Sequence, residues 1–199
     1  MLNVYLLRHG QTAWNADGNR YCGRTDLPLT ATGLAQAEAV SQQLKTVPFV
    51  AVYASPLQRA SQTAHLASGG KEVVTDARLI EVDFGTWEGK TKEAFMAENE
   101  RLWSEWMKDP GQSRAGGSGE TGWAVVNRVD AFFRELVQRH PDGNVLVVAH
   151  NGVNRLYLAH KLGMPLRHYR KLELDNSSVT HFTLDSLGEL TLKRLNSYL

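Results

Sequence analysis

The sequence predicts an α/β protein, a three-layer α/β/α sandwich with a mostly parallel central sheet, and three observations support this. Short apolar runs alternate with helical patterns along the chain, as in parallel strands joined by covering helices. Residues 144–149 (NVLVVA) are apolar after the initial asparagine, as expected of a strand buried on both faces. The length of 199 residues suits one well-buried domain better than two. We therefore expect a single domain over residues 1–199, with a helical lid insertion at about residues 90–120.

The part of the chain before the expected lid predicts three strands and two helices. The strands are short apolar runs at residues 3–7, 50–54 and 72–75. Between the first two strands, Thr30 is a suitable N-cap for a helix whose apolar residues follow helical spacing at Leu34, Ala37, Val40 and Leu44. Pro56 suits the first turn of a second helix, which runs to about residue 67.

The rest of the chain predicts the lid, two long helices and a closing hairpin. A helical pattern carrying Trp103 and Trp106 follows Gly89, and we expect both tryptophans to pack the helix rather than hold a ligand. A glycine-rich stretch at 112–119 could be a linker between domains, but neither flank alone would complete a domain, so we expect a mobile loop. The remaining expected elements are helices at 121–139 and from the buried strand to about 162, and strands at 179–184 and 190–195.

Composition and charge exclude several classes of protein. The formal net charge of +1 provides no overall field that would attract nucleic acid or a membrane surface. Cys22 is the only cysteine, so neither an internal disulfide nor a cysteine-based zinc site is expected. No apolar run reaches transmembrane length, and the first residues lack the features of a signal peptide. A cytoplasmic protein is therefore expected.

Two predicted strands end in similar polar segments. The first strand is followed by Arg8, His9 and Gly10, and the strand at 144–149 is followed by His150 and Asn151. Ligands bind at the carboxyl ends of strands in parallel sheets. A lone histidine at a strand end more often serves a structural hydrogen bond, but two histidines and an arginine at two such ends indicate a shared anion pocket.

A third strand end and an acidic loop add candidates for the same pocket. Arg59 follows the strand at 50–54 and could clamp a phosphate together with Arg8, because guanidinium groups match phosphate geometry. Taken alone, Arg59 would more often be a surface residue paired with a carboxylate. The glycine-bounded loop at 79–89 carries three carboxylates, and their spacing does not settle which one is catalytic: Glu81, Asp83 or Glu88.

Together these segments resemble the histidine phosphatase superfamily, in its phosphoglycerate-mutase-like branch, over essentially the whole chain. The triplet RHG alone is a weak signal. Four such segments in the family's order, each at a strand end, are a strong signal, and two further segments also match. The matching segments are LLRHGQTAWN, LTATG, ASPLQRASQTA, LIEVDFGTWEG, GETGWAVVNRV and VVAHNGV.

The resemblance implies chemical roles at matching positions. His9 would be the nucleophile that accepts the phosphoryl group, and Glu81 would donate a proton to the leaving oxygen. Arg8, Arg59 and His150 would hold the phosphoryl oxygens and supply the positive charge that magnesium supplies elsewhere. A neutral imidazole is needed for attack, so a backbone carbonyl near Gly10 would hold the proton on the other ring nitrogen. We expect no metal ion and no cofactor.

The resemblance also implies secondary contacts. Asn15 and the main chain near Asn151 would assist phosphate binding, although the family often has glycine where this chain has Asn151. Cys22 and Gly23 lie in a loop that reaches the site in relatives. Cys22 could be an oxidation switch if the cationic pocket stabilised its thiolate, but a passive small residue is the expected role. Lys92 matches a lysine that mutases use for the substrate carboxylate. Asp83 and Glu88 would serve local hydrogen bonds.

Three functions fit these residues. The first is a metal-independent phosphomonoesterase acting on a small phosphorylated metabolite. The second is a cofactor-dependent phosphoglycerate mutase, favoured by Lys92 but opposed by the absence of an arginine pair in the insertion, which has only isolated Arg101 and Arg114. The third is a non-catalytic module that binds a phosphorylated ligand, which would need neither His9 nor Glu81. The expected partner is a small phosphate ester, and a homodimer is compatible with the sequence.

Overall fold

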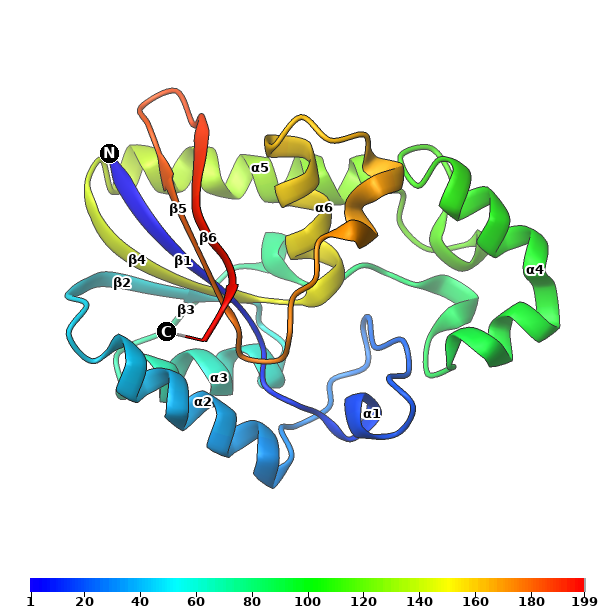
Figure 1. Ribbon diagram of the computed structural model, residues 1–199, viewed down its shortest axis with the longest axis horizontal. Coiled ribbons are helices and arrows are strands. Elements are labelled where there is room, and N and C mark those ends of the chain that lie inside the picture. Colours follow the sequence, from blue (N-terminus) through cyan, green and yellow to red (C-terminus); the bar gives the residue numbers. More distant parts are fainter. Residues whose placement is uncertain (199) are drawn as a thin grey trace.

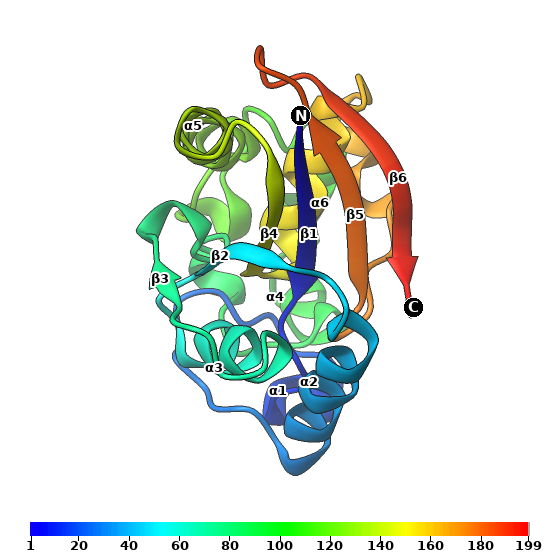
Figure 2. The same ribbon diagram turned by 90° about the vertical axis from the view of Figure 1, so that its left-hand side faces the viewer.

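The computed structural model describes residues 1–198 and contains one six-stranded sheet. The strand order is β3-β2-β4-β1-β5-β6, with parallel pairing between β3 and β2, β2 and β4, and β4 and β1. Only β5 runs against both of its neighbours (Figure 2). The mostly parallel sheet predicted from the sequence is therefore confirmed. Its strands are β1 (Leu2–Arg8), β2 (Phe49–Ala54), β3 (Val74–Thr75), β4 (Gly143–Ala149), β5 (Val179–Leu184) and β6 (Leu190–Ser197).

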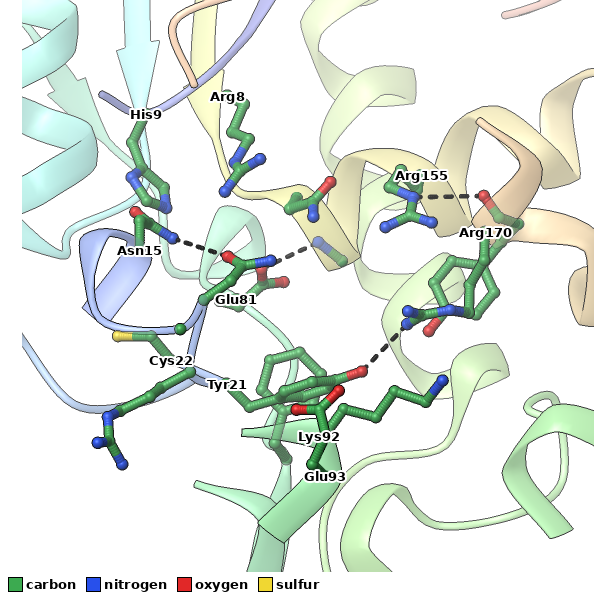
Figure 3. A pocket seen from close by; sticks show the side chains of 17 residues that line it. Arg8, His9, Asn15, Tyr21, Cys22, Glu81, Lys92, Glu93, Arg155 and Arg170 are labelled. Atoms are coloured by element: carbon green, nitrogen blue, oxygen red, sulfur yellow. Dashed lines mark hydrogen bonds between the residues drawn. The ribbon is translucent and has the colours of Figure 1, made fainter. Parts of the chain in front are cut away.

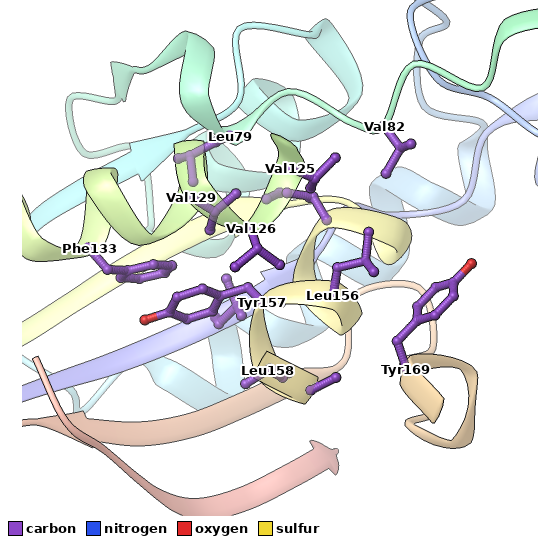
Figure 4. Packing of buried hydrophobic residues seen from close by; sticks show 14 of the residues in the cluster. Leu79, Val82, Val125, Val126, Val129, Phe133, Leu156, Tyr157, Leu158 and Tyr169 are labelled. Carbon is purple, nitrogen blue, oxygen red and sulfur yellow. The ribbon is translucent and has the colours of Figure 1, made fainter. Parts of the chain in front are cut away.

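Helices cover both faces of the sheet, which gives the predicted sandwich (Figure 1). One face is covered by α2 (Ala31–Leu44) and α3 (Gln58–Ala67), which share an apolar cluster with β2 and β4. The other face is covered by α5 (Gly122–Arg139) and α6 (Asn151–Lys161). Here the rings of Phe133 and Tyr157 stack with centroids 4.5 Å apart, among the valines of α5 (Figure 4). None of the helices in the described chain has the length and apolarity needed to span a membrane.

The predicted helix starts agree with the structure where a capping side chain marks them. Thr30 and Thr121 are the N-caps of α2 and α5, and each accepts a backbone N–H from the first turn. Helix α4 (Lys92–Lys108), in the segment where a lid is expected, is capped in the same way, but it bends at Asn99, whose backbone leaves the helical region. The strand predicted at 72–75 is reduced to β3, and the short α1 (Ala13–Ala16) was not expected.

The glycine-rich stretch is packed, so the expectation of a mobile loop is wrong. Ala115 and Gly116 are buried within a short 3-10 turn (Ala115–Gly117) that lies on the acidic loop. Thr86 donates to the Gly116 carbonyl at 2.8 Å. Gly116 has φ 57°, and a Cβ there would lie 2.2 Å from the carbonyl oxygen of Phe84. The glycines permit close contact between two backbones, which a composition-based argument mistakes for flexibility.

The central strand β1 pairs with strands that lie far away in the sequence. Leu2 is opposite Gly143 of β4 on one side and Leu184 of β5 on the other. The segment before β5 then crosses the end of β1, where Ser177 N–H donates to the Arg8 carbonyl at 3.0 Å. This arrangement fixes the backbone at the carboxyl ends of β1 and β4.

Candidate active site

A cavity of about 350 Å³ opens at the carboxyl ends of β1 and β4 (Figure 3). Its lining falls into two groups of polar side chains. We call the group on one side, formed by Arg8, His9, Asn15 and Glu81, the histidine end. We call the group on the other side, formed by Lys92, Arg155 and Arg170, the arginine end.

His9 is held in one tautomer by its own loop. Its Nδ1 lies 2.7 Å from the Gly10 carbonyl oxygen, which can only accept, so Nδ1 carries the proton. The lone pair is therefore on Nε2. Burial lowers the pKa of His9 well below the usual imidazole value, and the charges of Arg59 and Arg8 lower it further. His9 is consequently a neutral imidazole with a free nucleophilic nitrogen, as the sequence analysis required.

His150 presents the complementary atom, a free N–H group. The Arg59 Nε–H donates to His150 Nδ1 at 3.2 Å, and a guanidinium cannot accept, so a neutral His150 has its proton on Nε2. Within residues 1–198, His150 Nε2 is buried and has no hydrogen-bond partner. Burial, followed by Arg59 and His9, lowers the pKa of His150 well below its usual value. The centroids of the two histidine rings lie 5.1 Å apart, so His150 packs beside His9, but it is not among the residues that line the cavity.

Arg59 lies behind the cavity and is not among its lining residues. It is fully buried, and its remaining N–H groups donate to the carbonyls of Thr25 at 2.7 Å, Gly23 at 2.9 Å and Cys22 at 3.2 Å. In this structure, Arg59 orients His150 and holds the loop that carries these three carbonyls in place. The structure therefore does not bring Arg59 and Arg8 together as two arms of a clamp at the cavity wall.

Arg8 is the cation of the histidine end. Its Nη1 donates to the Leu174 carbonyl at 2.7 Å, while its buried Nε has no partner among the described residues. Burial lowers the pKa of Arg8 to about 10, although Glu81 opposes this effect. Arg8 still carries its charge at neutral pH, and an unpaired buried donor favours binding of an anion.

Glu81 is fixed at the start of α6 by three backbone N–H groups. Oε1 accepts from Val82 and Val153, and Oε2 accepts from Gly152, each at 2.9 Å. A carboxylate in this place is stabilised by the helix N-terminus. Its backbone is held as well, because Arg128 Nη2 donates to the Glu81 carbonyl at 3.3 Å. Arg128, from α5, is a positioning residue that the sequence analysis missed.

The other predicted residues divide between the cavity and its support. Asn15, Cys22, Lys92 and Asn151 line the cavity, whereas Gly23 does not. Asn15 Oδ1 is occupied by the N–H and hydroxyl groups of Thr12, both at 3.0 Å. Asn151 Oδ1 is buried and, among residues 1–198, has no partner.

Cys22 and the remaining carboxylates have local roles. Burial raises the pKa of the Cys22 thiol to about 11, so the stabilised thiolate that an oxidation switch needs is absent. Glu88 accepts the backbone N–H groups of Gly23 and Thr25, both at 2.9 Å, and Asp83 accepts that of Gly85 at 2.9 Å. Both acids serve local hydrogen bonds, as expected.

Comparison with known proteins agrees with this geometry. The sequence profile of the histidine phosphatase superfamily (branch 1) matches residues 4–197. The chain belongs to this superfamily.

The relatives of this chain include phosphatases and probable mutases. Phosphoserine phosphatase 1 of Hydrogenobacter thermophilus is 32% identical over 97% of this chain and 92% of its own length. A probable phosphoglycerate mutase, GpmB of Proteus mirabilis, is 32% identical over 90% of this chain and 84% of its own. The crystal structure of Entamoeba histolytica phosphoserine phosphatase with 3-phosphoglyceric acid matches with a TM-score of 0.89 and 30% identity, covering 99% of this chain and 98% of that one. Its membership of this superfamily and the phosphatases among its relatives identify the chain as a phosphatase.

The arginine end of the cavity was not predicted from the sequence. Arg155 could have been found, because it lies four positions after Asn151 on α6 and so shares its helix face. Arg170 gives no local signal, since it lies in the short 3-10 helix Leu166–Lys171 beyond a turn. Tyr21 and Tyr169, which support these arginines, were missed for the same reason. The described residues contain no group of three or more histidine, cysteine, aspartate or glutamate side chains that could hold a metal ion.

Proposed function

We propose that this phosphatase hydrolyses phosphate monoesters of small metabolites through a covalent phosphohistidine on His9. The observation that carries the proposal is the pairing of two buried histidine side chains, of which His9 lines the cavity and His150 packs beside it with ring centroids 5.1 Å apart. His9 offers a free lone pair on Nε2, and the neighbouring His150 offers an unpartnered Nε2–H group. The first atom can attack phosphorus while the second, with Arg8, stabilises the charge on the phosphoryl oxygens.

The reaction then has two displacement steps. His9 Nε2 forms a bond to phosphorus as the bond from phosphorus to the ester oxygen breaks, and Glu81 protonates the departing oxygen. Water next attacks phosphorus, the P–N bond breaks, and Glu81 takes a proton from that water, which restores the free enzyme. Glu81 must be protonated when it acts as the acid. We infer that one of its bonds to a backbone N–H, such as that from Gly152 at the cavity wall, opens when the substrate binds.

Hydrolysis is favoured over mutase activity by the open rim of the cavity. Lys92 and Glu93, at the start of α4, line the cavity and are exposed to solvent, so water can reach a phosphohistidine. A mutase must protect the same intermediate from water. A specific observation nevertheless keeps the mutase as a second candidate. The insertion has no arginine pair, but Arg155 and Arg170 bring two arginines to the cavity from outside it.

The test is trapping of the covalent intermediate. After rapid mixing with a labelled phosphate ester and quenching, the wild type should carry an acid-labile, base-stable phosphoryl group. His9→Ala should carry none and should lose turnover, whereas His65→Ala, at an exposed position on α3, should behave as the wild type. Full turnover by His9→Ala would overturn the mechanism. Supply of 3-phosphoglycerate with a bisphosphoglycerate primer separates the two candidates, since rapid formation of 2-phosphoglycerate with little free phosphate would favour the mutase.

A cytoplasmic location and a homodimer also belong to this proposal. The cytoplasmic location is supported by the single cysteine and by a small-metabolite substrate. Cell fractionation and sedimentation analysis test the two statements.

A further inference from the structure

The arginine end of the cavity carries a concentration of positive charge that the proposed chemistry at His9 does not use. Arg155, Arg170 and Lys92 lie across the cavity from His9 and Arg8 (Figure 3). They come from α6, from the 3-10 helix Leu166–Lys171 and from α4, three separate elements. The whole chain has a formal net charge of only +1, so this cluster is a local feature and not part of a general basic surface.

Each guanidinium is held in place while most of its donors stay free. Arg155 Nε donates to the Tyr169 carbonyl at 3.4 Å, and the guanidinium lies 5.2 Å from the centroid of the Tyr169 ring. Arg170 Nη1 donates to the Tyr21 hydroxyl at 3.1 Å. A guanidinium has five N–H donors, so one protein contact leaves most of them for a ligand.

Among the described residues, no carboxylate forms an ion pair with either arginine, although Glu81 and Glu93 line the same cavity. Neither Arg155 nor Arg170 takes part in any ion pair within residues 1–198, although both are half-buried. Instead, the charges of Arg170 and Lys92 lie over the same Trp103 ring, at 4.9 Å and 5.2 Å from its centroid. Burial lowers the pKa of Arg155, although Glu81 opposes this effect. A bound anion would pair directly with the free donors of both arginines.

We propose that the arginine end binds a second anionic group, a carboxylate or a second phosphate, on the same small molecule whose phosphate reacts at His9. The proposal rests on the proposed function and specifies its substrate class. Guanidinium groups bind both anions through two parallel hydrogen bonds, so Arg155 and Arg170 suit either. A cavity of about 350 Å³ accommodates a small metabolite that spans the two ends.

Matched pairs of substrates test the proposal in the wild type. Phosphoserine is compared with phosphoethanolamine, which lacks the carboxylate, and 3-phosphoglycerate is compared with glycerol 3-phosphate. Fructose 1,6-bisphosphate against fructose 6-phosphate tests a second phosphate in place of a carboxylate. We expect kcat/KM for the doubly anionic member of at least one pair to exceed that of its partner by about 10- to 100-fold, the effect of a charge-assisted hydrogen bond.

Variants then assign the preference to the arginine end. Arg170→Gln and Arg155→Gln should each reduce that preference by about tenfold or more, mainly through KM. Arg170→Lys, which keeps the charge but loses the fork, should fall between the wild type and Arg170→Gln. Arg167→Gln is the matched control, because Arg167 lies in the same 3-10 helix but is exposed and outside the cavity. It should keep the wild-type preference.

The outcomes separate this proposal from the proposed function. Equal kcat/KM within all three pairs, or a preference that survives in both glutamine variants, would overturn the second-anion site while leaving phosphohistidine chemistry in place. A wild type that hydrolyses no phosphate ester, p-nitrophenyl phosphate included, and forms no phosphohistidine would overturn the proposed function itself. Hydrolysis of p-nitrophenyl phosphate by each variant shows that the variant is folded.

Discussion

The role of Glu81 as the acid can be tested by Glu81→Gln, and the structure predicts that this change has two separable effects. The first is structural. In the carboxylate, Oε1 accepts two N–H groups and Oε2 accepts the N–H of Gly152. A glutamine amide has one oxygen, so its NH₂ group must face at least one N–H donor. One unsatisfied buried N–H, together with the lost charge at the N-terminus of α6, should lower the free energy of unfolding by about 2–4 kcal/mol.

The second effect concerns the chemical step and depends on the leaving group. An alkyl phosphate needs a proton on its departing oxygen, and general acid catalysis typically contributes about 10²- to 10⁴-fold. p-Nitrophenolate departs without a proton, so Glu81→Gln should lower kcat/KM for p-nitrophenyl phosphate by less than about tenfold. A purely structural defect would lower both rates by the same factor.

The assay compares kcat/KM for an alkyl phosphate and for p-nitrophenyl phosphate in three proteins, because kcat/KM reports the transfer to His9 and not the later attack of water in which Glu81 also acts. Glu88→Gln is the matched control, because Glu88 belongs to the same loop and also accepts backbone N–H groups, but it does not line the cavity. The Glu88→Gln variant should be less stable than the wild type, and its kcat/KM values for the two esters should fall by the same factor. If Glu81→Gln gave the same equal loss on both esters, Glu81 would not be the proton donor, and Asp83 would be the next candidate.

Three further predictions follow from burial and backbone geometry. Cys22 should resist iodoacetamide at pH 7.5, because a thiol pKa of about 11 in place of 9.0 leaves roughly 100-fold less thiolate than in a free cysteine; rapid alkylation would contradict this. Gly116→Ala should lower the free energy of unfolding in urea by about 2–4 kcal/mol, whereas Gly163→Ala, also at positive φ but with open space around its Cβ, should cost about 1 kcal/mol. Similar losses would mean that the backbone contact at Gly116 is unimportant. The pH profile of kcat/KM should show no loss of activity as the pH falls through 6.5, because the lowered pKa of His9 keeps its ring neutral there; a loss centred on 6.5 would show an ordinary imidazole.

The sequence predicted those parts of the fold whose signals are local. The apolar run of β4, the cap at Thr30 and the helix expected from residue 121 are such signals, because each depends on a few consecutive residues. The pocket at the strand ends could be predicted as well, because parallel strands bring His9 and His150 to the same edge of the sheet.

The parts that could not be predicted depend on contacts between distant segments. Gly116 packs on the acidic loop at Phe84, and only that contact distinguishes a buried glycine turn from a flexible one. The same limit applies to Arg170, which reaches the cavity because Tyr21 and Trp103 hold it there. The family pattern likewise gave no indication that Arg59 is occupied by the carbonyls of its neighbouring loop.

The central place of β1 has a consequence for how the protein is made. This strand is synthesised long before its two neighbours, β4 and β5, and pairing between such distant segments is slow. The apolar residues of β1 therefore have no sheet to join until residues 143–149 have been translated. A nascent chain ending at Gly152 would already contain Arg8, His9, Glu81 and His150. It would still lack β5 and the crossing segment at Ser177 that fixes the end of β1, so we expect it to be inactive until these segments have been synthesised.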